Sequence, residues 1–220
     1  MNDNPLTIYY FTDILCVWAW IAERRIEELN NHFGNKIEIN HQYIDLFGDA
    51  ESRIQDQWAN KGLHKGFGEH VIEAAAPYES APVNADVWNK VSPTTSANAH
   101  MLIKAVELAC CKSSAIQYAK LLRKSFFIEA MDISDLQTLF LLLKQENIDA
   151  DQINLVLNNG KALAALMNDY QKANTYGIKG SPSLVLNDGR QNLFGNVGYK
   201  VLKANIEELL DKSYNEASWC

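Results

Sequence analysis

Cys16 is the residue of this 220-residue chain whose type and position most clearly suggest chemistry. It follows residues 6–11, which are rich in β-branched and aromatic side chains and predict a strand. Beyond it, Trp18, Ile21 and Leu29 recur at helical spacing, so Cys16 falls at the start of a helix. A helix N-terminus offers unpaired N–H groups and a positive dipole end, which favour a thiolate. We therefore expect a Cys16 pKa below about 8.5 and a nucleophilic sulfur, with a buried packing cysteine as the alternative.

The neighbouring residues resemble the active-site segment of a known family. The chain resembles the DsbA family in Asp13-Ile14-Leu15-Cys16-Val17-Trp18-Ala19-Trp20, followed by Arg24-Arg25-Ile26-Glu27. The likeness is closest to the FrnE-like branch and to its relatives, 2-hydroxychromene-2-carboxylate isomerase and kappa-class glutathione transferase. In redox members two cysteines flank two residues, whereas this chain has Cys16 at the first position and Ala19 at the second.

The order of predicted elements matches that family. A strand at 6–11, a helix and a second strand at 36–44 form a βαβ unit, whose strands must run parallel. A predicted hairpin at 183–194 and a final helix at 199–210 close the chain. We predict an α/β, thioredoxin-like fold with an all-helical, DsbA-like insertion. Its parts are residues 1–47 (first part of the core), 48–172 (insertion) and 173–220 (second part of the core).

The insertion carries successive helical patterns. Its glycine- and proline-rich part, up to residue 93, predicts loops and short helices. After it we expect helices at 96–112, 116–127, 134–145, 149–157 and 161–173. Asp132 or Ser134 is the expected N-cap of the third, and the run 139–143 is apolar enough to be buried. In the final helix we expect five inward side chains: Val201, Leu202, Ile206, Leu209 and Leu210.

A second segment bears on the site. Gly180-Ser181-Pro182-Ser183 resembles the cis-proline loop of thioredoxin-like proteins, which lies against the cysteine-bearing helix. The resemblance implies a cis Ser181–Pro182 bond, a Ser181 hydroxyl near the Cys16 sulfur, and pairing of this backbone with a partner's extended chain. We expect Trp18 to be exposed and to wall the substrate site, whereas Trp20 is expected in the core.

Composition limits the function classes. A net charge of −7 and a pI near 5.2 argue against nucleic acid, and no apolar stretch approaches the roughly 20 residues of a membrane span. The N-terminus has no secretory pattern, so we expect a cytoplasmic protein with reduced thiols. Cys110 and Cys111 are expected to be packing residues in a helix, and Cys220 ends the chain. Two points stay open: whether one of these three cysteines replaces the second active-site thiol that is absent at Ala19, and the oligomeric state of the protein.

Other candidate residues carry less weight. His64, Glu69, His70 and Glu73 do not have the spacing of a helical zinc pair, so we expect no metal. Three glycines at 62, 66 and 68 do not form a phosphate loop. His100 is expected on a helix surface, although it could face the cleft, and Arg24 and Arg25 are expected to be solvated rather than to assist the thiolate.

The resemblance implies thiol–disulfide oxidoreductase-like activity through a single cysteine. Cys16 can form a mixed disulfide but cannot resolve it internally, so an outside thiol such as glutathione is implied as co-substrate. One alternative is a glutathione-dependent isomerase or transferase acting on a small aromatic compound, although residues 193–198 lack the Asp-Arg or Asp-Thr pair expected to hold the γ-glutamyl end of glutathione. Another alternative is a redox-inactive peptide-binding protein. Thiol–disulfide exchange needs an exposed Cys16 sulfur with a depressed pKa, whereas an isomerase or transferase needs a deep apolar pocket beside this sulfur.

Overall fold

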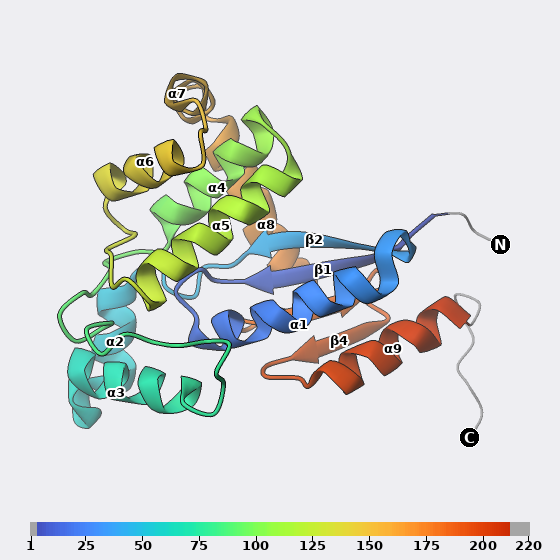
Figure 1. The fold of residues 1–220 in the computed structure, drawn as a ribbon, viewed down its shortest axis with the longest axis horizontal. Coiled ribbons are helices and arrows are strands. Elements are labelled where there is room, and N and C mark those ends of the chain that lie inside the picture. Colours follow the sequence, from blue (N-terminus) through green and yellow to red (C-terminus); the bar gives the residue numbers. More distant parts are fainter. Residues whose placement is uncertain (1–3, 212–220) are drawn as a thin grey trace.

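The computed structural model describes residues 4–211, and in these a four-stranded sheet is covered by helices on both faces (Figure 1). The strands are β1 (Leu6–Thr12), β2 (Ile37–Tyr43), β3 (Ser183–Leu186) and β4 (Gln191–Phe194). The helices are α1 (Val17–Phe33), α2 (Ala50–Trp58), α3 (Leu63–Ala75), α4 (Ala97–Ala109), α5 (Lys112–Phe127), α6 (Leu136–Gln145), α7 (Ala150–Asn158), α8 (Lys161–Thr175) and α9 (Tyr199–Asp211). Short 3-10 turns at Gly34–Lys36 and Ala59–Lys61 complete the order.

The sheet has the strand order β2-β1-β3-β4. β1 and β2 run parallel, as the predicted βαβ unit requires, whereas β3 is antiparallel to both β1 and β4. Asn187 and Asp188 take positive φ in the turn that joins β3 to β4, as expected for a tight hairpin. Because β1 lies in the centre, the loop at its carboxyl end meets both neighbouring strands and the beginning of α1.

Alternate residues of β1 supply the two faces of the sheet. Ile8 and Tyr10 pack with the apolar faces of α1 and α9, which lie together in front of the sheet in Figure 1. Phe11 and Val185 pack on the opposite face with Ala173 of α8. A strand whose neighbours are helices on both faces loses the alternation of polar and apolar residues, and this explains the nearly continuous apolar run of β1.

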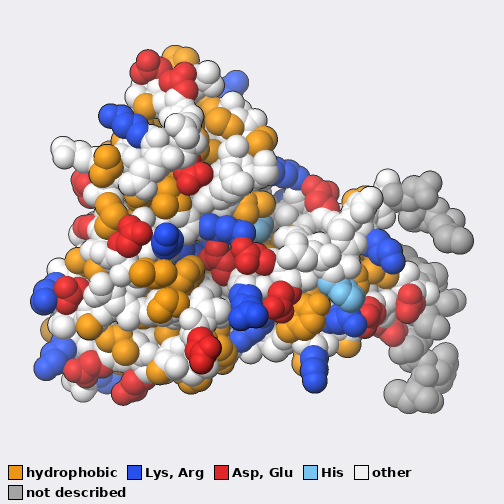
Figure 2. Space-filling view, in the orientation of Figure 1, with side chains coloured by type: hydrophobic (Ala, Val, Ile, Leu, Met, Phe, Trp, Pro, Cys, Tyr) orange, Lys and Arg blue, Asp and Glu red, His pale blue; other side chains and the backbone are white. Residues whose placement is uncertain are grey.

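The helices of the insertion pack at one end of the sheet, where α4, α5, α6 and α7 stand above α2 and α3 (Figure 1). The largest buried cluster extends from the Cys16 loop through α4 and α5 to α8, so the insertion and the sheet share a core. None of the helices within residues 4–211 has the length and apolar character needed to cross a membrane. On the face drawn in Figure 2, cationic and anionic side chains intermix, and neither sign forms a patch of its own.

Several sequence predictions about these helices were wrong in detail. The N-cap of α6 is Asp135, whose carboxylate accepts the Thr138 N–H, because the helix begins later than expected. Leu141 is 52% exposed, since α6 lies on the outside of the bundle and turns one side to solvent. In α9, Val201 and Leu210 face outward at 51% and 36% exposure, because the sheet covers only one stripe of this terminal helix.

A buried ion pair joins α4 to α8 beneath the edge of the sheet. Lys104 lies 3.3 Å from Asp169, and Glu107 provides a second carboxylate at 2.7 Å. The other role of Asp169 is to accept the outward-pointing N–H of Tyr43 at the end of β2. The carboxylate therefore ties the edge strand to the helical layer and compensates a cation that is 6% exposed.

Asp169→Asn should destabilise the protein while keeping the shape of the side chain. Removing one partner of a buried ion pair leaves Lys104 with Glu107 alone, and we expect the free energy of unfolding to fall by about 3 kcal/mol. Urea denaturation followed by circular dichroism measures this loss. The matched control is Asp86→Asn in the exposed Lys90–Asp86 pair, for which the expected loss is below about 1 kcal/mol. Equal losses in the two variants would contradict a stabilising role of the buried pair.

Candidate active site

Cys16 caps the N-terminus of α1, as its position in the sequence predicted. The Cys16 carbonyl accepts the N–H groups of Ala19 and Trp20, and the Cys16 N–H is donated to the Asp13 carbonyl. The Cys16 thiol donates a hydrogen bond to the backbone carbonyl of Ser181, with 3.2 Å between the sulfur and the oxygen. The residue is 4% exposed, so the sulfur lies beneath the surface at the junction of α1 and the loop before β3.

The acidity expected for Cys16 is not found in this arrangement. Burial raises the pKa of Cys16 above its usual value, and the negative charge of Asp13 raises it further. Hydrogen bonding by the Ser181 side chain and the Ala19 backbone lowers the pKa of Cys16, but it does not outweigh the loss of water around the sulfur. The prediction of a depressed pKa was therefore wrong for the free protein, and the sulfur is buried, as in the alternative of a packing cysteine, because placement at a helix N-terminus does not by itself provide solvation.

The loop opposite the sulfur contains the expected cis peptide bond, between Ser181 and Pro182. Ser181 adjoins the sulfur as the resemblance implied, but the acceptor of the thiol is the backbone carbonyl. The Ser181 hydroxyl accepts the Asp13 N–H at 3.0 Å, and it also acts on the Cys16 sulfur, whose pKa it lowers. Further along the loop, the Gly195 N–H is donated to the Pro182 carbonyl, which fixes the loop to the end of β4. The cis-proline loop and the cysteine loop are thus joined by two direct hydrogen bonds.

The Asp13 carboxylate organises the cysteine loop, a role that our reading of the sequence missed. The side chain is fully buried and accepts four protein hydrogen bonds. One oxygen accepts the Leu15 N–H at 2.9 Å, and the other accepts the Ser96 hydroxyl at 2.8 Å and the N–H groups of Leu46 and Phe47. Asp13 therefore connects three segments that are distant in sequence. The available signal was a carboxylate placed directly after an apolar strand, in the loop that carries the cysteine.

His100 supports the same loop from α4. Its Nε2 accepts the Ile14 N–H at 3.0 Å, and its ring lies against that of Tyr43, with the centroids 4.7 Å apart. The residue has no exposed surface, so the prediction of a helix-surface histidine was wrong. Helical spacing does not reveal which neighbour covers a polar residue, and here the cysteine loop does. Burial lowers the pKa of His100 to about 4, which keeps Nε2 available as an acceptor at neutral pH.

The remaining residues of the motif are arranged around the first turns of α1. Trp18 and Trp20 are both partly buried against the main core, so they do not divide into one exposed and one core residue. The Trp20 indole N–H donates a hydrogen bond to the Pro82 carbonyl, and its ring stacks on that of Phe127, with the ring centroids 5.7 Å apart.

The two arginines of the motif lie further along α1. Arg24 pairs with Glu28 on the surface of the helix, as expected for a solvated residue. The Arg25 guanidinium lies over the Tyr78 ring and donates a hydrogen bond to the side-chain oxygen of Asn196.

The other described cysteines lie away from Cys16. Both Cys110 and Cys111 are exposed, so the expectation of packing residues was wrong; α4 ends before them and α5 begins after them. His100 lies at the end of α4 that contacts the cysteine loop, and Cys110 follows the opposite end of this helix. Because ten helical residues rise by about 15 Å, neither thiol reaches Cys16 in the same chain. Hydroxyls of Ser113 and Ser114 lower the pKa of Cys111 to about 7. Cys220 lies outside the described residues.

The weaker candidates of the sequence do not assemble into a metal centre. His64 pairs with Glu51 through its Nε2 at 2.9 Å. Among residues 4–211, no group of three or more histidine, cysteine, aspartate or glutamate side chains is arranged to hold a metal ion.

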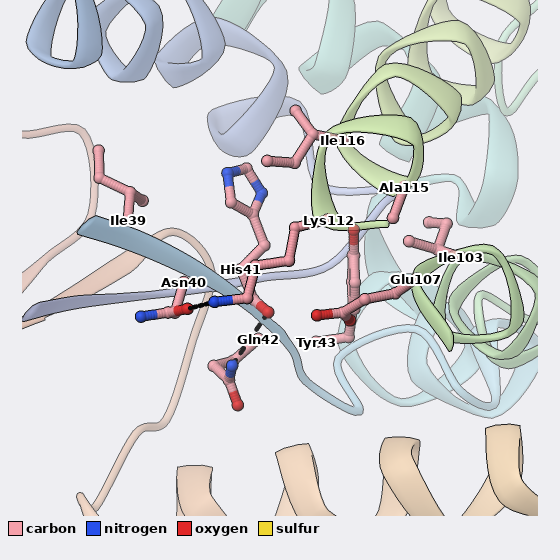
Figure 3. A pocket seen from close by; sticks show the side chains of 10 residues that line it. All are labelled: Ile39, Asn40, His41, Gln42, Tyr43, Ile103, Glu107, Lys112, Ala115 and Ile116. Atoms are coloured by element: carbon pink, nitrogen blue, oxygen red, sulfur yellow. Dashed lines mark hydrogen bonds between the residues drawn. The ribbon is translucent and has the colours of Figure 1, made fainter. Parts of the chain in front are cut away.

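A pocket between β2 and the α4–α5 pair is drawn in Figure 3. At the edge of this pocket the Lys112 ammonium donates a hydrogen bond to the side-chain oxygen of Asn40, and the His41 ring points toward Ile116 (Figure 3). Burial lowers the pKa of His41 to about 3, so this ring is neutral. The lining does not include Cys16, Trp18 or Ser181, and it therefore does not provide the apolar pocket beside the sulfur that the isomerase alternative requires.

Comparison with known proteins agrees with this geometry. A family model described as Thioredoxin matches residues 9–209. The chain belongs to the thioredoxin family. A "ClpXP adapter protein SpxH" of Halalkalibacterium halodurans is 23% identical over 94% of this chain and 68% of that protein. The protein of the same name from Bacillus subtilis is also 23% identical, with the same coverage.

Solved structures define the architecture more closely. A Streptomyces coelicolor structure described as a probable DsbA oxidoreductase has a TM-score of 0.76 at 16% identity, covering 98% of this chain and 94% of that one. The cytosolic disulfide reductase DsbM of Pseudomonas aeruginosa has a TM-score of 0.69 at 17% identity, covering 92% and 99%. A 2-hydroxychromene-2-carboxylate isomerase has a TM-score of 0.62 at 18% identity, covering 92% and 95%. The predicted DsbA-like fold, with its helical insertion, is confirmed.

The neutral, buried state of His100 makes stability depend on pH. Its pKa is about 4 in the folded protein, compared with about 6.5 in an unfolded chain, so the unfolded state takes up a proton first as pH falls. The stabilising effect is complete above pH 6.5 and is lost as pH falls toward 4. Between pH 7 and pH 5, we expect wild type to lose about 2 kcal/mol more than His100→Gln in the free energy of unfolding.

The glutamine of this variant offers a neutral acceptor for the Ile14 N–H, so the comparison isolates the titration of the imidazole. Urea denaturation at the two pH values measures the difference. If wild type and His100→Gln lost the same free energy, protonation of His100 would not be linked to unfolding.

Proposed function

We propose that this chain performs thiol–disulfide exchange through Cys16 alone, at a site that is closed until a partner docks on Ser181. The observation that carries the proposal is the 3.2 Å hydrogen bond from the Cys16 thiol to the Ser181 carbonyl, next to the cis Ser181–Pro182 bond. A docked extended chain would pair with this same backbone. Its N–H would compete with the thiol for the carbonyl, and the freed thiol would ionise more readily.

The exchange balances without a second protein thiol. The Cys16 thiolate attacks one sulfur of a partner disulfide, forms a mixed disulfide and expels the other sulfur as a thiolate. Ala19 occupies the position from which a resolving cysteine would act, so an external thiol must attack the mixed disulfide. Glutathione suits this role, since its backbone amides can pair with Ser181. A similar DsbM structure was solved with GSH, which supports glutathione as the co-substrate here.

A second candidate is a protein-binding function without redox chemistry. The burial of Cys16, its raised pKa and the alanine at position 19 favour this candidate. The curated relatives, which are named as adapters of ClpXP, also support a role in which the chain binds another protein. In this case the loop around Ser181 would hold a partner segment, and Cys16 would act only in packing.

Reaction with two small disulfides separates these candidates. The protein for this test carries serine at positions 110, 111 and 220, so that Cys16 is the remaining thiol. With bis(2-hydroxyethyl) disulfide, which lacks backbone amides, we expect Cys16 to react at least about tenfold more slowly in the folded than in the urea-unfolded protein. With oxidised glutathione we expect much less protection, because the peptide can pair with Ser181. Intact-protein mass spectrometry measures both rates.

A further Cys16→Ser substitution is the control and should abolish both adducts. If the folded protein formed no glutathione adduct while the unfolded protein did, the exchange proposal would fail and the protein-binding candidate would stand. Equal protection against the two disulfides would contradict the role of Ser181 pairing.

Replacing Ala19 with Cys should restore dithiol chemistry in the same background. The variant places two cysteines three positions apart in the first turn of α1, which is the spacing in redox members of the DsbA family. We expect an internal disulfide on oxidation, seen as a loss of about 2 Da by mass spectrometry, and reduction of insulin by the dithiol form. Ala22→Cys is the matched control, because Ala22 is similarly buried in the same helix but one turn further from Cys16. If the position-19 variant formed no disulfide, the scaffold would not be that of an exchange protein.

A further inference from the structure

The insertion contributes to a groove whose lining contains no residue of the Cys16 loop. It runs between α8 and the beginning of α4 and ends at the loop after β2. Its apolar lining includes Met101, Leu163, Leu166, Met167 and Tyr170. The space it encloses is roughly 700 Å³, including its open mouth, which is enough for several side chains.

The apolar wall of this groove is exposed along one face of α8. Leu163 is 50% exposed and Met167 is 46% exposed, and a spacing of four residues places them on the same side of the helix. Of the ten large hydrophobic residues that are exposed within residues 4–211, five lie on α6, α7 and α8. Flexible methionines at two positions, 101 and 167, suit a surface that adapts to a bound side chain.

Carboxylates form the end of the groove at the loop after β2. Asp45 and Asp49 line it, and its lining contains no lysine or arginine. Asp49 caps α2 by accepting the Ser52 N–H. Within residues 4–211, the Asp45 carboxylate has no hydrogen bond or ion pair, and its charge acts on Tyr170. The Tyr170 hydroxyl beside them is buried and has no hydrogen-bond partner in the same range. Burial and the charge of Asp45 raise the pKa of Tyr170, so this hydroxyl remains a donor.

We propose that this groove binds a segment of a partner protein that carries apolar side chains next to a lysine or arginine. The apolar residues would cover Leu163 and Met167, and the cation would lie at Asp45. Charge complementarity favours a partner of this kind over a second copy of the same chain, whose net charge is −7. The inference does not rest on the proposed exchange reaction, because the groove includes neither Cys16 nor Ser181.

Selection from a phage-displayed library of short random peptides tests the groove directly. We expect the full-length protein to enrich peptides that combine apolar residues with lysine or arginine. An enriched peptide is then synthesised with a fluorophore, and its affinity is measured by fluorescence anisotropy. Leu163→Ser and Met167→Ser should each weaken binding by roughly tenfold, since both remove apolar contacts at the centre of the groove. Asp45→Asn should weaken binding, and more so at low salt.

Leu155→Ser is the matched control, because Leu155 is 68% exposed on α7 and does not line the groove. This variant should bind the peptide like wild type, and all four variants change exposed residues, so they should fold. Cys16→Ser should also leave binding unchanged, which separates this site from the exchange site. The proposal is overturned if no peptide is enriched, if the enriched peptides are acidic, or if binding is insensitive to Leu163→Ser and Met167→Ser.

Discussion

The buried carboxylate of Asp13 is the interaction on which the rest of the site depends. Its two oxygens accept the Leu15 N–H, the Ser96 hydroxyl and two N–H groups of the loop after β2. A buried acceptor with these partners fixes the loop after β1 against both the sheet and the insertion. The held loop places the cysteine at the head of α1 opposite the cis-proline loop, to which it is joined by two direct hydrogen bonds. The geometry of the thiol is therefore a consequence of a carboxylate three residues earlier.

The same arrangement determines the state of the thiol. A helix N-terminus favours a thiolate, but a sulfur that has lost its water and lies near a carboxylate is held as a thiol. The hydrogen bond to the Ser181 carbonyl uses the proton and thus favours the neutral form. Electrostatic placement and solvation act in opposite directions here, and solvation prevails in the free protein. In the proposed exchange function, chemistry at Cys16 would therefore require a partner that changes its surroundings.

The insertion contributes to the site and also provides surface for other contacts. Ser96 and His100, at the first turns of α4, reach the cysteine loop, and Lys104 on the next turn meets Asp169 of α8. One helix thus links the site, the edge of the sheet and the outer helical layer. The groove between α4 and α8 adjoins the loop after β2, whose N–H groups bind Asp13. The helices of the insertion therefore support the cysteine from one side while leaving an apolar face uncovered on another.

The sequence by itself determined the order of the elements, the place of Cys16 at a strand–helix junction and the missing second cysteine. Local periodicity and residue type encode the first two features, since each depends on neighbours within a few positions, whereas the position of the missing cysteine comes from the resemblance to the DsbA family. The cis bond at Pro182 was predicted from a resemblance rather than from local physics. Only the tertiary structure decided that Asp13 and His100 support the loop, that Cys16 is buried, and that Cys110 and Cys111 are remote and exposed. Burial and long-range hydrogen bonds depend on which segments meet in space, and the solvation that determines the state of a thiol is a property of that assembly.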